Sequence, residues 1–289
     1  MSFISKKDLK LVKRDPKGHK GDNGRVLVIG GSRDYVGALV LAGLAALRCG
    51  VDWVTVAAPS KVGWAVSALS ADLVVKKYKG EEFNVSQAKD VLKFSSGFDA
   101  VLIGNGIGIK SKSFVKKFVK KNKKLMVIDA DGIKPVGLND VDNVIITPHL
   151  KELEMFLENS KIDEKIIKKI TNKKLPINKK SIIIRNILKK LNKKIVVLLK
   201  GPVDAVISGD RIKLNMTGNA GMTKAGTGDV LAGLCLGYLG QTGDLFQSAV
   251  NAAYISGVIG DILLKKKKGF SYIASDMVEE IENIKKKLN

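Results

Sequence analysis

The sequence predicts an α/β fold with a central, mostly parallel sheet and helices on both faces of that sheet. Two observations support this prediction. Short apolar runs typical of buried strands alternate with helix-like segments along most of the 289 residues, and this alternation is typical of a parallel sheet. Several of the apolar runs end in glycine, aspartate, histidine or lysine. These residues would line one edge of the sheet, where open α/β sheets bind their ligands.

The strands are predicted from apolar runs with few polar residues, as expected where helices cover both faces of a sheet. The first, RVLVIGG at 25–31, precedes the small-residue segment 37–50, which predicts a helix packed closely on it. A hairpin is predicted at 205–215, with its turn at 208–210. The remaining strands are predicted at 51–59, 72–78, 98–106, 123–131, 142–149 and 193–201.

Hydrophobic residues make up 45% of the chain and no break in composition divides it, so we expect residues 1–289 to form one domain. The lysine-rich segment 159–194 has weak helical periodicity, and we expect surface helices there, with an insertion as an open alternative. Lysines 265–268 followed by Gly269 predict a helix end, because cations there face the negative end of the helix dipole. C-terminal helices are predicted at 228–240, 244–264 and 275–287.

The net charge of +22 makes nucleic-acid binding one interpretation of this chain. Three features favour the alternative of a lysine-rich solvent surface. Lysine dominates over arginine, which is the better residue for base contacts. The lysines come in scattered pairs such as Lys168-Lys169, and aromatic residues make up only 6% of the chain. We therefore expect no nucleic-acid partner.

The sequence also bears on cellular location. Cys49 and Cys235 have neither metal-ligand nor disulfide spacing, and we expect both to be buried and reduced. The N-terminus has no apolar core followed by a small-residue cleavage site. The longest apolar stretches, such as 230–240, fall well below the ~18 residues of a membrane span. We expect a cytoplasmic protein with no membrane partner.

The strongest motif is GNAGMTKAGTGDVLAG at 218–233. Its AGTG segment, 225–228, leads into an apolar helix, so backbone N–H groups and the helix N-terminus would form an anion hole suited to a phosphoryl group. Asp229 falls in the first turn, where a carboxylate is also an ordinary helix cap. Capping alone does not require the AGTG segment, nor the small Ala232 and Gly233. The motif lacks the Lys-Ser/Thr that a P-loop needs after its last glycine.

AGTGDVLAG resembles the anion-hole and catalytic-aspartate motif of ribokinase-like vitamin kinases, and the full motif is similar to that of ADP/ATP-dependent NAD(P)H-hydrate dehydratases. The resemblance covers nearly the whole chain except roughly 159–194. Seven ordered motifs carry it, and together they are far more specific than one glycine loop. The other six are GHKGDNGRVLVIGGSRDYVGALVLAGLAALRCGVDWVTVAAP (18–59), VLIGNGIG (101–108), IDADGI (128–133), ITPHLKELEMF (146–156), VVLLKGPVDAVI (196–207) and ASDMVEEI (274–281).

The resemblance implies a ribokinase-like fold and the dehydration of the S-epimer of hydrated NADH or NADPH, driven by ATP or ADP with Mg²⁺. Some family members carry an N-terminal epimerase domain, and we expect the dehydratase alone here. The sequence departs from the family pattern at Leu150-Lys151, where Pro-Gly is usual, and at Ala220, where proline is usual. It also departs at Lys224, where a small or hydroxyl residue is common. These departures bear on substrate and nucleotide preference, not on the class of enzyme.

Asp229 is the general base that the resemblance implies. It would deprotonate the ring hydroxyl of the substrate, which then accepts the terminal phosphoryl group of the nucleotide. Phosphate departs as electrons of the ring nitrogen restore the dihydropyridine. The backbone N–H groups of 226–229 would stabilise charge on the phosphoryl group in transfer. The implied nucleotide-binding residues are Lys200, Gly201, Pro202, Val203, Asp204, Gly226, Thr227 and Gly228.

Each implied site residue has a plainer alternative. Lys200 stands among apolar residues before a glycine that permits close backbone approach, which favours a phosphate partner over a lysine that reaches solvent. His149 is implied as a substrate contact, and the alternative is a solvated loop histidine. Glu152 is implied to hold Mg²⁺ through water, and the alternative is a carboxylate on a helix face. His19 is as well explained by a loop at a subunit contact. Further implied substrate contacts are Ala38 and Gly106, small residues at strand-to-helix turns.

Two rival functions stay open. A ribokinase-like vitamin-precursor kinase would share Asp229, Lys200 and the anion hole but would leave a phosphorylated product. A nucleic-acid-binding protein would show no nucleotide-dependent chemistry. A dehydrogenase is disfavoured, because the glycine loops at 30–33 and 104–108 miss the G-x-G-x-x-G spacing. The sequence does not decide between ATP and ADP, or between NADH and NADPH. Nor does it decide whether a separate epimerase partner exists, or the oligomeric state, although the family implies a homo-oligomer, with a tetramer as one form.

Overall fold

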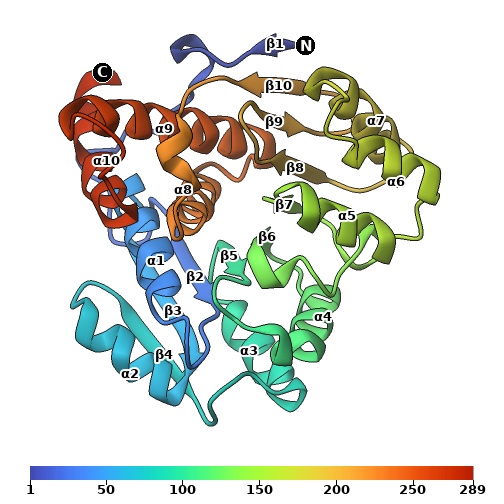
Figure 1. Ribbon diagram of the computed structural model, residues 1–289. Coiled ribbons are helices and arrows are strands. Elements are labelled where there is room, and N and C mark those ends of the chain that lie inside the picture. Colours follow the sequence, from blue (N-terminus) through green and yellow to red (C-terminus); the bar gives the residue numbers. More distant parts are fainter. Residues whose placement is uncertain (289) are drawn as a thin grey trace.

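The computed structural model describes residues 1–288, with side chains described as far as Ile284. Its strands form a ten-stranded sheet in the order β1-β10-β9-β8-β7-β6-β5-β2-β3-β4 (Figure 1). Only β9 runs antiparallel to its neighbours among these strands, which confirms the predicted mostly parallel sheet. The strands are β1 (Ser2–Phe3), β2 (Arg25–Ile29), β3 (Trp53–Pro59), β4 (Val74–Tyr78), β5 (Ala100–Ile103), β6 (Leu125–Ile128), β7 (Val144–Ile146), β8 (Ile195–Leu199), β9 (Asp204–Ile207) and β10 (Ile212–Asn215).

The strand order reverses its direction of growth between β2 and β5. From β2 the chain adds β3 and β4 on one side, and then returns to place β5, β6, β7 and β8 in succession on the other side. Ile29 at the end of β2 is level with Ile103 at the end of β5. The two following loops therefore leave the sheet side by side. In open parallel sheets this reversal is where ligands bind, because the loops diverge and leave a crevice.

Helices cover both faces of the sheet, as predicted, and each layer encloses its own apolar core. The helices of one layer are α1 (Gly37–Cys49), α2 (Ser60–Leu69), α8 (Thr227–Thr242), α9 (Leu245–Lys266) and α10 (Ala274–Leu288). Those of the other layer are α3 (Ala88–Ser95), α4 (Lys112–Lys121), α5 (Leu150–Asn159), α6 (Glu164–Thr171) and α7 (Ile177–Lys189).

Helix α8 packs so closely on α1 that glycine is required at the contact (Figure 1). A Cβ atom at Gly233 would lie 2.3 Å from the carbonyl oxygen of Ala42, and one at Gly237 would lie 2.6 Å from Cβ of Cys49. Real Cβ atoms do not approach other atoms so closely. The small residues that follow Asp229 in the sequence therefore have a packing role, which fixes the position of the α8 N-terminus.

The observed strands are shorter than the predicted ones, because the flanking residues form loops at the edges of the sheet. The predicted strand 98–106 is a strand only at Ala100–Ile103, since Gly104 leaves the sheet with a φ of 127°. The predicted hairpin is confirmed, with its turn closed by a hydrogen bond from Ser208 N to Arg211 O. Strand β1 was not predicted, because two residues carry no periodic pattern.

The lysine-rich segment 159–194 folds into α6 and α7, and the predicted helices are confirmed. The apolar side of these two helices faces the sheet. It contributes four buried residues to the core of this layer, namely Ile167, Ile170, Ile184 and Leu188. An insertion relative to related proteins stays a prediction. Both cysteines are buried, as expected. Within residues 1–288, no helix has the length and apolar character that crossing a membrane requires.

Candidate active site

Asp229 lies at the carboxyl edge of the sheet, in the first turn of α8, and it does not cap that helix. The N-cap is Gly226, with a φ of 90°, and no side chain caps the first turn. The Asp229 Oδ1 atom instead accepts a hydrogen bond of 2.6 Å from Nδ2 of Asn105, in the loop after β5. Of the two interpretations of this carboxylate, simple helix capping is therefore wrong.

The AGTG segment forms a rigid turn at the start of α8. Gly226 has a φ of 90°, and a Cβ atom there would lie 2.8 Å from Cβ of Ala274, so glycine is required. The Thr227 hydroxyl group lies 2.6 Å from the Met222 carbonyl oxygen and 2.9 Å from that of Lys224, which holds the turn in place. The first N–H groups of α8 have no partners within the helix. With the helix dipole they would suit an anion, and we call residues 225–228 the anion-binding turn after this predicted role.

Lys200 follows β8 and points into the protein, not into solvent. Its Nζ atom lies 3.0 Å from Oδ1 of Asp129 and 3.8 Å from Oε2 of Glu152. A Cβ atom at Gly228 would lie 3.7 Å from the same ammonium group, so Lys200 stands beside the anion-binding turn. Burial lowers the pKa of Lys200, but the charges of Asp129, Glu152 and Asp229 together raise it above its ordinary value. The site therefore holds a permanent cation next to the turn.

Asn105, Asp129 and Thr147 complete the site, and the sequence analysis assigned no role to them. Asp129 Oδ1 accepts a 2.6 Å hydrogen bond from the Thr147 hydroxyl group, and Oδ2 accepts one of 2.9 Å from Nδ2 of Asn105. All three residues are buried. Each follows a strand of the parallel part of the sheet, in the motifs GNG, DAD and TPH. That position was the available signal for a site residue.

The Asp229 carboxyl group is unusual in its electrostatics. Burial raises its pKa from 3.8 to about 6. The hydrogen bond from Asn105 and the charge of Lys200 oppose this rise, whereas the charge of Asp129 adds to it. A group with a pKa near 6 is ionised at neutral pH and accepts a proton readily, as a general base must.

His149 and Glu152 form a reciprocal cap at the start of α5. The His149 backbone N–H group donates to Oε2 of Glu152 at 2.9 Å, and the Glu152 N–H group donates to Nδ1 of His149 at 3.2 Å. The Glu152 side chain is buried, while that of His149 is 55% exposed. The histidine ring is thus held in place at the protein surface.

The site contains no preformed metal cage. Within the described chain, no group of three or more His, Cys, Asp or Glu side chains is arranged to hold a metal ion. Glu152 is a single carboxylate, and Lys200 stands 3.8 Å from it. This donor set fits only an ion held mainly by other ligands, such as Mg²⁺ bound to phosphate oxygens, with Glu152 acting through water.

The residues after Lys200 form a turn anchored by Asp204. The Gly201 N–H group donates to Oδ1 of Asp204 at 3.0 Å, and Nδ2 of Asn215 donates to Oδ2 at 3.2 Å. Burial raises the pKa of Asp204. Gly201 and Pro202 are exposed and Val203 is half-buried, so the turn offers backbone to a ligand while the carboxylate of Asp204 is occupied in holding it.

Ala38 and Gly106 come together at the reversal point of the sheet. A Cβ atom at Gly106 would lie 3.3 Å from Cβ of Ala38 and 2.6 Å from the carbonyl oxygen of Tyr35. Gly106 also has a φ of 63°, so glycine is required there. Next to this contact lies a cavity of about 470 Å³ lined by Arg33, Val36, Lys61, Val62, Ala65 and Glu81.

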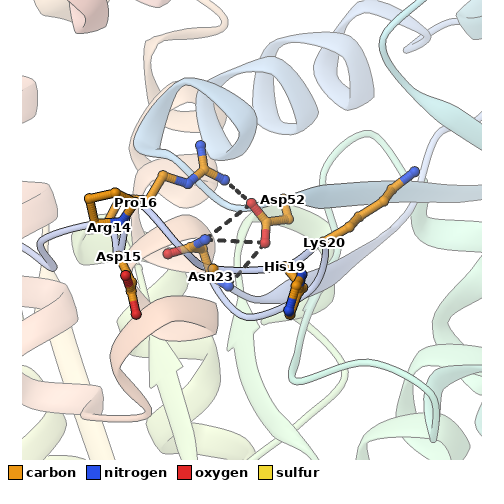
Figure 2. Close-up of a pocket in the computed structure, with 8 residues that line it drawn as sticks. Arg14, Asp15, Pro16, His19, Lys20, Asn23 and Asp52 are labelled. Carbon is orange, nitrogen blue, oxygen red and sulfur yellow. Dashed lines mark hydrogen bonds and ion pairs between the residues drawn. The ribbon is translucent and has the colours of Figure 1, made fainter.

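His19 lies apart from this group, near the amino ends of β2 and β3. It lines a cavity of about 550 Å³ together with residues of the N-terminal loop and Asp52 (Figure 2). Asp52 immediately precedes β3, and the loop of His19 precedes β2. The structure therefore does not bring His19 together with Asp229. A role for His19 at a subunit contact stays a prediction.

In comparison with known proteins, most of the chain matches the model of one protein family. Residues 26–283 match the family model of NAD(P)H-hydrate dehydratase. The chain is 38% identical over 286 residues to the bifunctional NAD(P)H-hydrate repair enzyme of Methanocaldococcus jannaschii, covering 96% of this chain and 52% of that protein. It is 31% identical over 274 residues to the ADP-dependent (S)-NAD(P)H-hydrate dehydratase of Cenarchaeum symbiosum, covering 92% of this chain and 90% of that protein. The chain thus spans about half the length of the bifunctional relatives.

Solved structures share the fold. The ADP/ATP-dependent NAD(P)H-hydrate dehydratase of Bacillus subtilis, co-crystallised with ATP and Mg²⁺, superposes with a TM-score of 0.81 at 22% identity, covering 100% of this chain and 99% of that one. The hydroxyethylthiazole kinase of Pyrococcus horikoshii superposes with a TM-score of 0.56 at 12% identity, covering 90% and 88%. At these identities the likeness concerns the fold, which is ribokinase-like, as predicted.

Proposed function

The chain belongs to the NAD(P)H-hydrate dehydratase family, and we propose that it uses ATP or ADP to dehydrate the S-epimer of hydrated NADH or NADPH. The observation that carries this proposal is the Asp229 carboxylate. It is desolvated, with a pKa raised to about 6, and it stands in the first turn of the helix that the anion-binding turn begins. A base and an anion site so placed suit the transfer of a phosphoryl group to a hydroxyl group.

In the proposed first step, Asp229 takes the proton of the ring hydroxyl group of the hydrated nicotinamide. The hydroxyl oxygen then forms a bond to the terminal phosphorus of the nucleotide, and the bond from that phosphorus to the leaving ADP or AMP breaks. The N–H groups at the start of α8 and the Lys200 ammonium group stabilise the negative charge of the phosphoryl oxygens. A Cβ atom at Gly228 would lie 3.7 Å from Nζ of Lys200, and this proximity supports the arrangement.

In the proposed second step, phosphate leaves and the nicotinamide ring regains its double bond. The carbon–oxygen bond to phosphate breaks as the ring nitrogen supplies its electron pair. The neighbouring ring carbon then gives a proton to the departing phosphate or to water, and its C–H electron pair forms the double bond of the dihydropyridine. Phosphorylation makes this elimination possible, because phosphate is a far better leaving group than hydroxide. The net products are NADH or NADPH, inorganic phosphate and the shortened nucleotide.

The nucleotide is proposed to lie between the 201–204 turn and the start of α8. On the side of the turn, the proposed contacts of the nucleotide are Lys200, Gly201, Pro202, Val203 and Asp204. Mg²⁺ would neutralise charge on the phosphate oxygens, with Glu152 holding it through water. The remaining members of the proposed nucleotide-binding set are Gly226, Thr227 and Gly228.

The hydrated dinucleotide is proposed to lie on the opposite side of Asp229, against Ala38, Gly106 and the exposed ring of His149. Gly106 admits a ligand close to the backbone. The 470 Å³ cavity beside Ala38 and Gly106 would receive the adenosine half of the substrate. Arg33, which lines this cavity, would interact with the negative charge of the pyrophosphate. The net charge of +22 would favour capture of such an anion.

The wider setting is part of the same proposal. We propose a single dehydratase domain over residues 1–289 that acts in the cytoplasm as a homo-oligomer, with a tetramer as one form.

The experiment that tests this function is recovery of the near-ultraviolet absorbance of reduced nicotinamide. Purified protein is mixed with hydrated NADH or hydrated NADPH, and each mixture receives ATP and Mg²⁺, ADP and Mg²⁺, or no nucleotide. Recovery only in the presence of a nucleotide would establish the dehydratase and identify its phosphoryl donor. No recovery from protein that binds ATP would contradict the proposal and favour a small-molecule kinase of the same fold.

A further inference from the structure

Asn105 is held rigidly at the end of β5, between two glycines that no other residue can replace. A Cβ atom at Gly104 would lie 2.0 Å from the Asp129 carbonyl oxygen, and one at Gly106 would lie 2.6 Å from that of Tyr35. The Asn105 carbonyl oxygen accepts a 2.9 Å hydrogen bond from the Gly31 N–H group. The backbone of Asn105 is therefore fixed on both sides, and its side chain is completely buried.

The amide nitrogen of Asn105 donates to two carboxylates at once, at 2.6 Å to Asp229 and at 2.9 Å to Asp129. The reverse orientation of the amide would place its oxygen against both carboxylates with no proton between them, so the observed orientation is the one that the charges enforce. Asp129 is in turn held by Lys200 and Thr147. A continuous chain of polar contacts thus runs from the Lys200 ammonium group to Asp229.

We infer that Asn105 is a positioning residue, which holds one oxygen of the Asp229 carboxylate so that the other faces the acceptor hydroxyl group. This inference rests on the proposed role of Asp229 as the base. In the described part of the chain, Asn105 provides the only side-chain hydrogen bond to Asp229. A fixed base within reach of its proton is more effective than one that rotates freely, because the correct geometry does not have to be found at each turnover.

The same hydrogen bond controls the ionisation of the base. The charged groups that act on Asp229 are Asp129 at the end of β6 and Lys200 at the end of β8. A hydrogen bond donated to a carboxylate favours its charged form. Loss of the Asn105 donor therefore raises the pKa of Asp229, and a carboxylate at position 105 raises it further by repulsion.

The test compares Asn105→Ala and Asn105→Asp with the wild-type protein in the pH dependence of kcat/KM for the hydrated dinucleotide. In both variants we expect the pH below which activity falls to move upward by about one unit, with the larger shift in Asn105→Asp. For Asn105→Ala the nucleotide Kd is expected to change little, since the Asn105 side chain donates only to Asp129 and Asp229 and to no residue of the proposed nucleotide-binding set. Direct titration of the Asp229 carboxyl carbon by NMR in the same variants should show the same shift.

Asn251→Ala is the matched control. Asn251 in α9 is equally buried, and its side chain also joins separate segments, because it bonds the backbone of Lys10 in the N-terminal loop. This variant should lose stability without moving the pH profile. The inference would be overturned if the Asn105 variants lost activity at all pH values while Asp229 titrated as in the wild type. Because the NMR titration needs no substrate, it judges Asn105 even if the wild-type protein proves not to be a dehydratase.

Discussion

Two partly buried aspartates, Asp52 and Asp229, lie at opposite edges of the sheet, and their carboxylates have very different hydrogen-bond partners. Asp52 lies among donors (Figure 2). Its oxygens accept hydrogen bonds from the N–H groups of Gly21 and Asn23 at 2.8 and 3.1 Å, from the Asn23 side-chain amide, and from the Arg14 guanidinium group. Its side chain is only 6% exposed. Such a carboxylate is fully engaged in holding the N-terminal loop against β3.

Asp229 has one side-chain donor, Asn105, and a second carboxylate, Asp129, close by. Its desolvation is therefore only partly compensated, and its pKa rises to about 6. The comparison teaches that burial alone does not identify a reactive carboxylate. What distinguishes Asp229 is burial with too few donors, next to a site for an anion. A charged group that its surroundings stabilise poorly is typical of catalytic residues.

The largest expected difference between the two residues is in turnover. Asp229→Asn removes the base but keeps the shape of the side chain and an oxygen that can accept from Asn105. We expect kcat to fall by about 100- to 10,000-fold, the usual contribution of a general base, with nucleotide binding retained. Absorbance recovery and calorimetric titration with ATP measure the two quantities. Wild-type turnover by this variant would show that Asp229 is not the base.

Asp52→Ala should reverse this pattern, with a large loss of stability and unchanged turnover. The change leaves the partly buried N–H groups of Gly21 and Asn23 without their acceptor, and we expect the free energy of unfolding to fall by about 2 to 4 kcal/mol. Denaturant unfolding measures this loss, and Asp52→Asn serves as the milder, nearly isosteric variant. If Asp52→Ala were as stable as the wild type, our account of this carboxylate as a structural anchor would be wrong.

The pH dependence of wild-type activity tests the raised pKa that distinguishes Asp229 from Asp52. Asp229 must be ionised to accept a proton, and its pKa is about 6. We therefore expect kcat/KM to be constant above that pH and to fall about tenfold per unit below it. Nucleotide affinity measured over the same range controls for protonation of the phosphates. Full activity maintained down to pH 5 would contradict the raised pKa.

The smallest expected effect is a gain in stability from removing the catalytic charge. Because the pKa of Asp229 is raised in the folded protein, ionisation of this group destabilises the fold. This destabilisation is absent well below pH 4 and complete above about pH 6. Asp229→Asn should therefore be more stable than the wild type by about 1 to 2 kcal/mol at pH 8 and not at pH 3. Unfolding curves at the two pH values measure the difference, and equal stability at both would argue against a strained base.

Much of the fold could be predicted from the sequence. Strands that are buried on both faces are apolar runs, and the chain leaves the sheet after them in loops rich in glycine or polar residues. RVLVIGG is an example, since its buried strand ends at glycines that admit the neighbouring loop. The anion-binding turn was also visible, because a glycine segment before a helix is a local pattern. The role of Asp229 came from the resemblance to the dehydratase family, because the local pattern alone also allows an ordinary helix cap.

The partners of Asp229 could not be predicted, because they are set by topology. Asn105 precedes Asp229 by 124 residues, and only the strand order places the end of β5 under the start of α8. Periodicity likewise does not show that Asp129 would pair with Lys200, since the register and order of β6, β7 and β8 decide it. His19 also lies in a matched motif, but the topology places it at the other edge of the sheet.

The most direct test of the contrast between the two carboxylates is an NMR titration of the aspartate carboxyl carbons in the free protein, with the Asp229 signal assigned by its loss in Asp229→Asn. We predict that Asp229 titrates near pH 6, as expected of a desolvated base held by the single amide of Asn105. A midpoint near 4, the ordinary value for an exposed aspartate, would contradict the account.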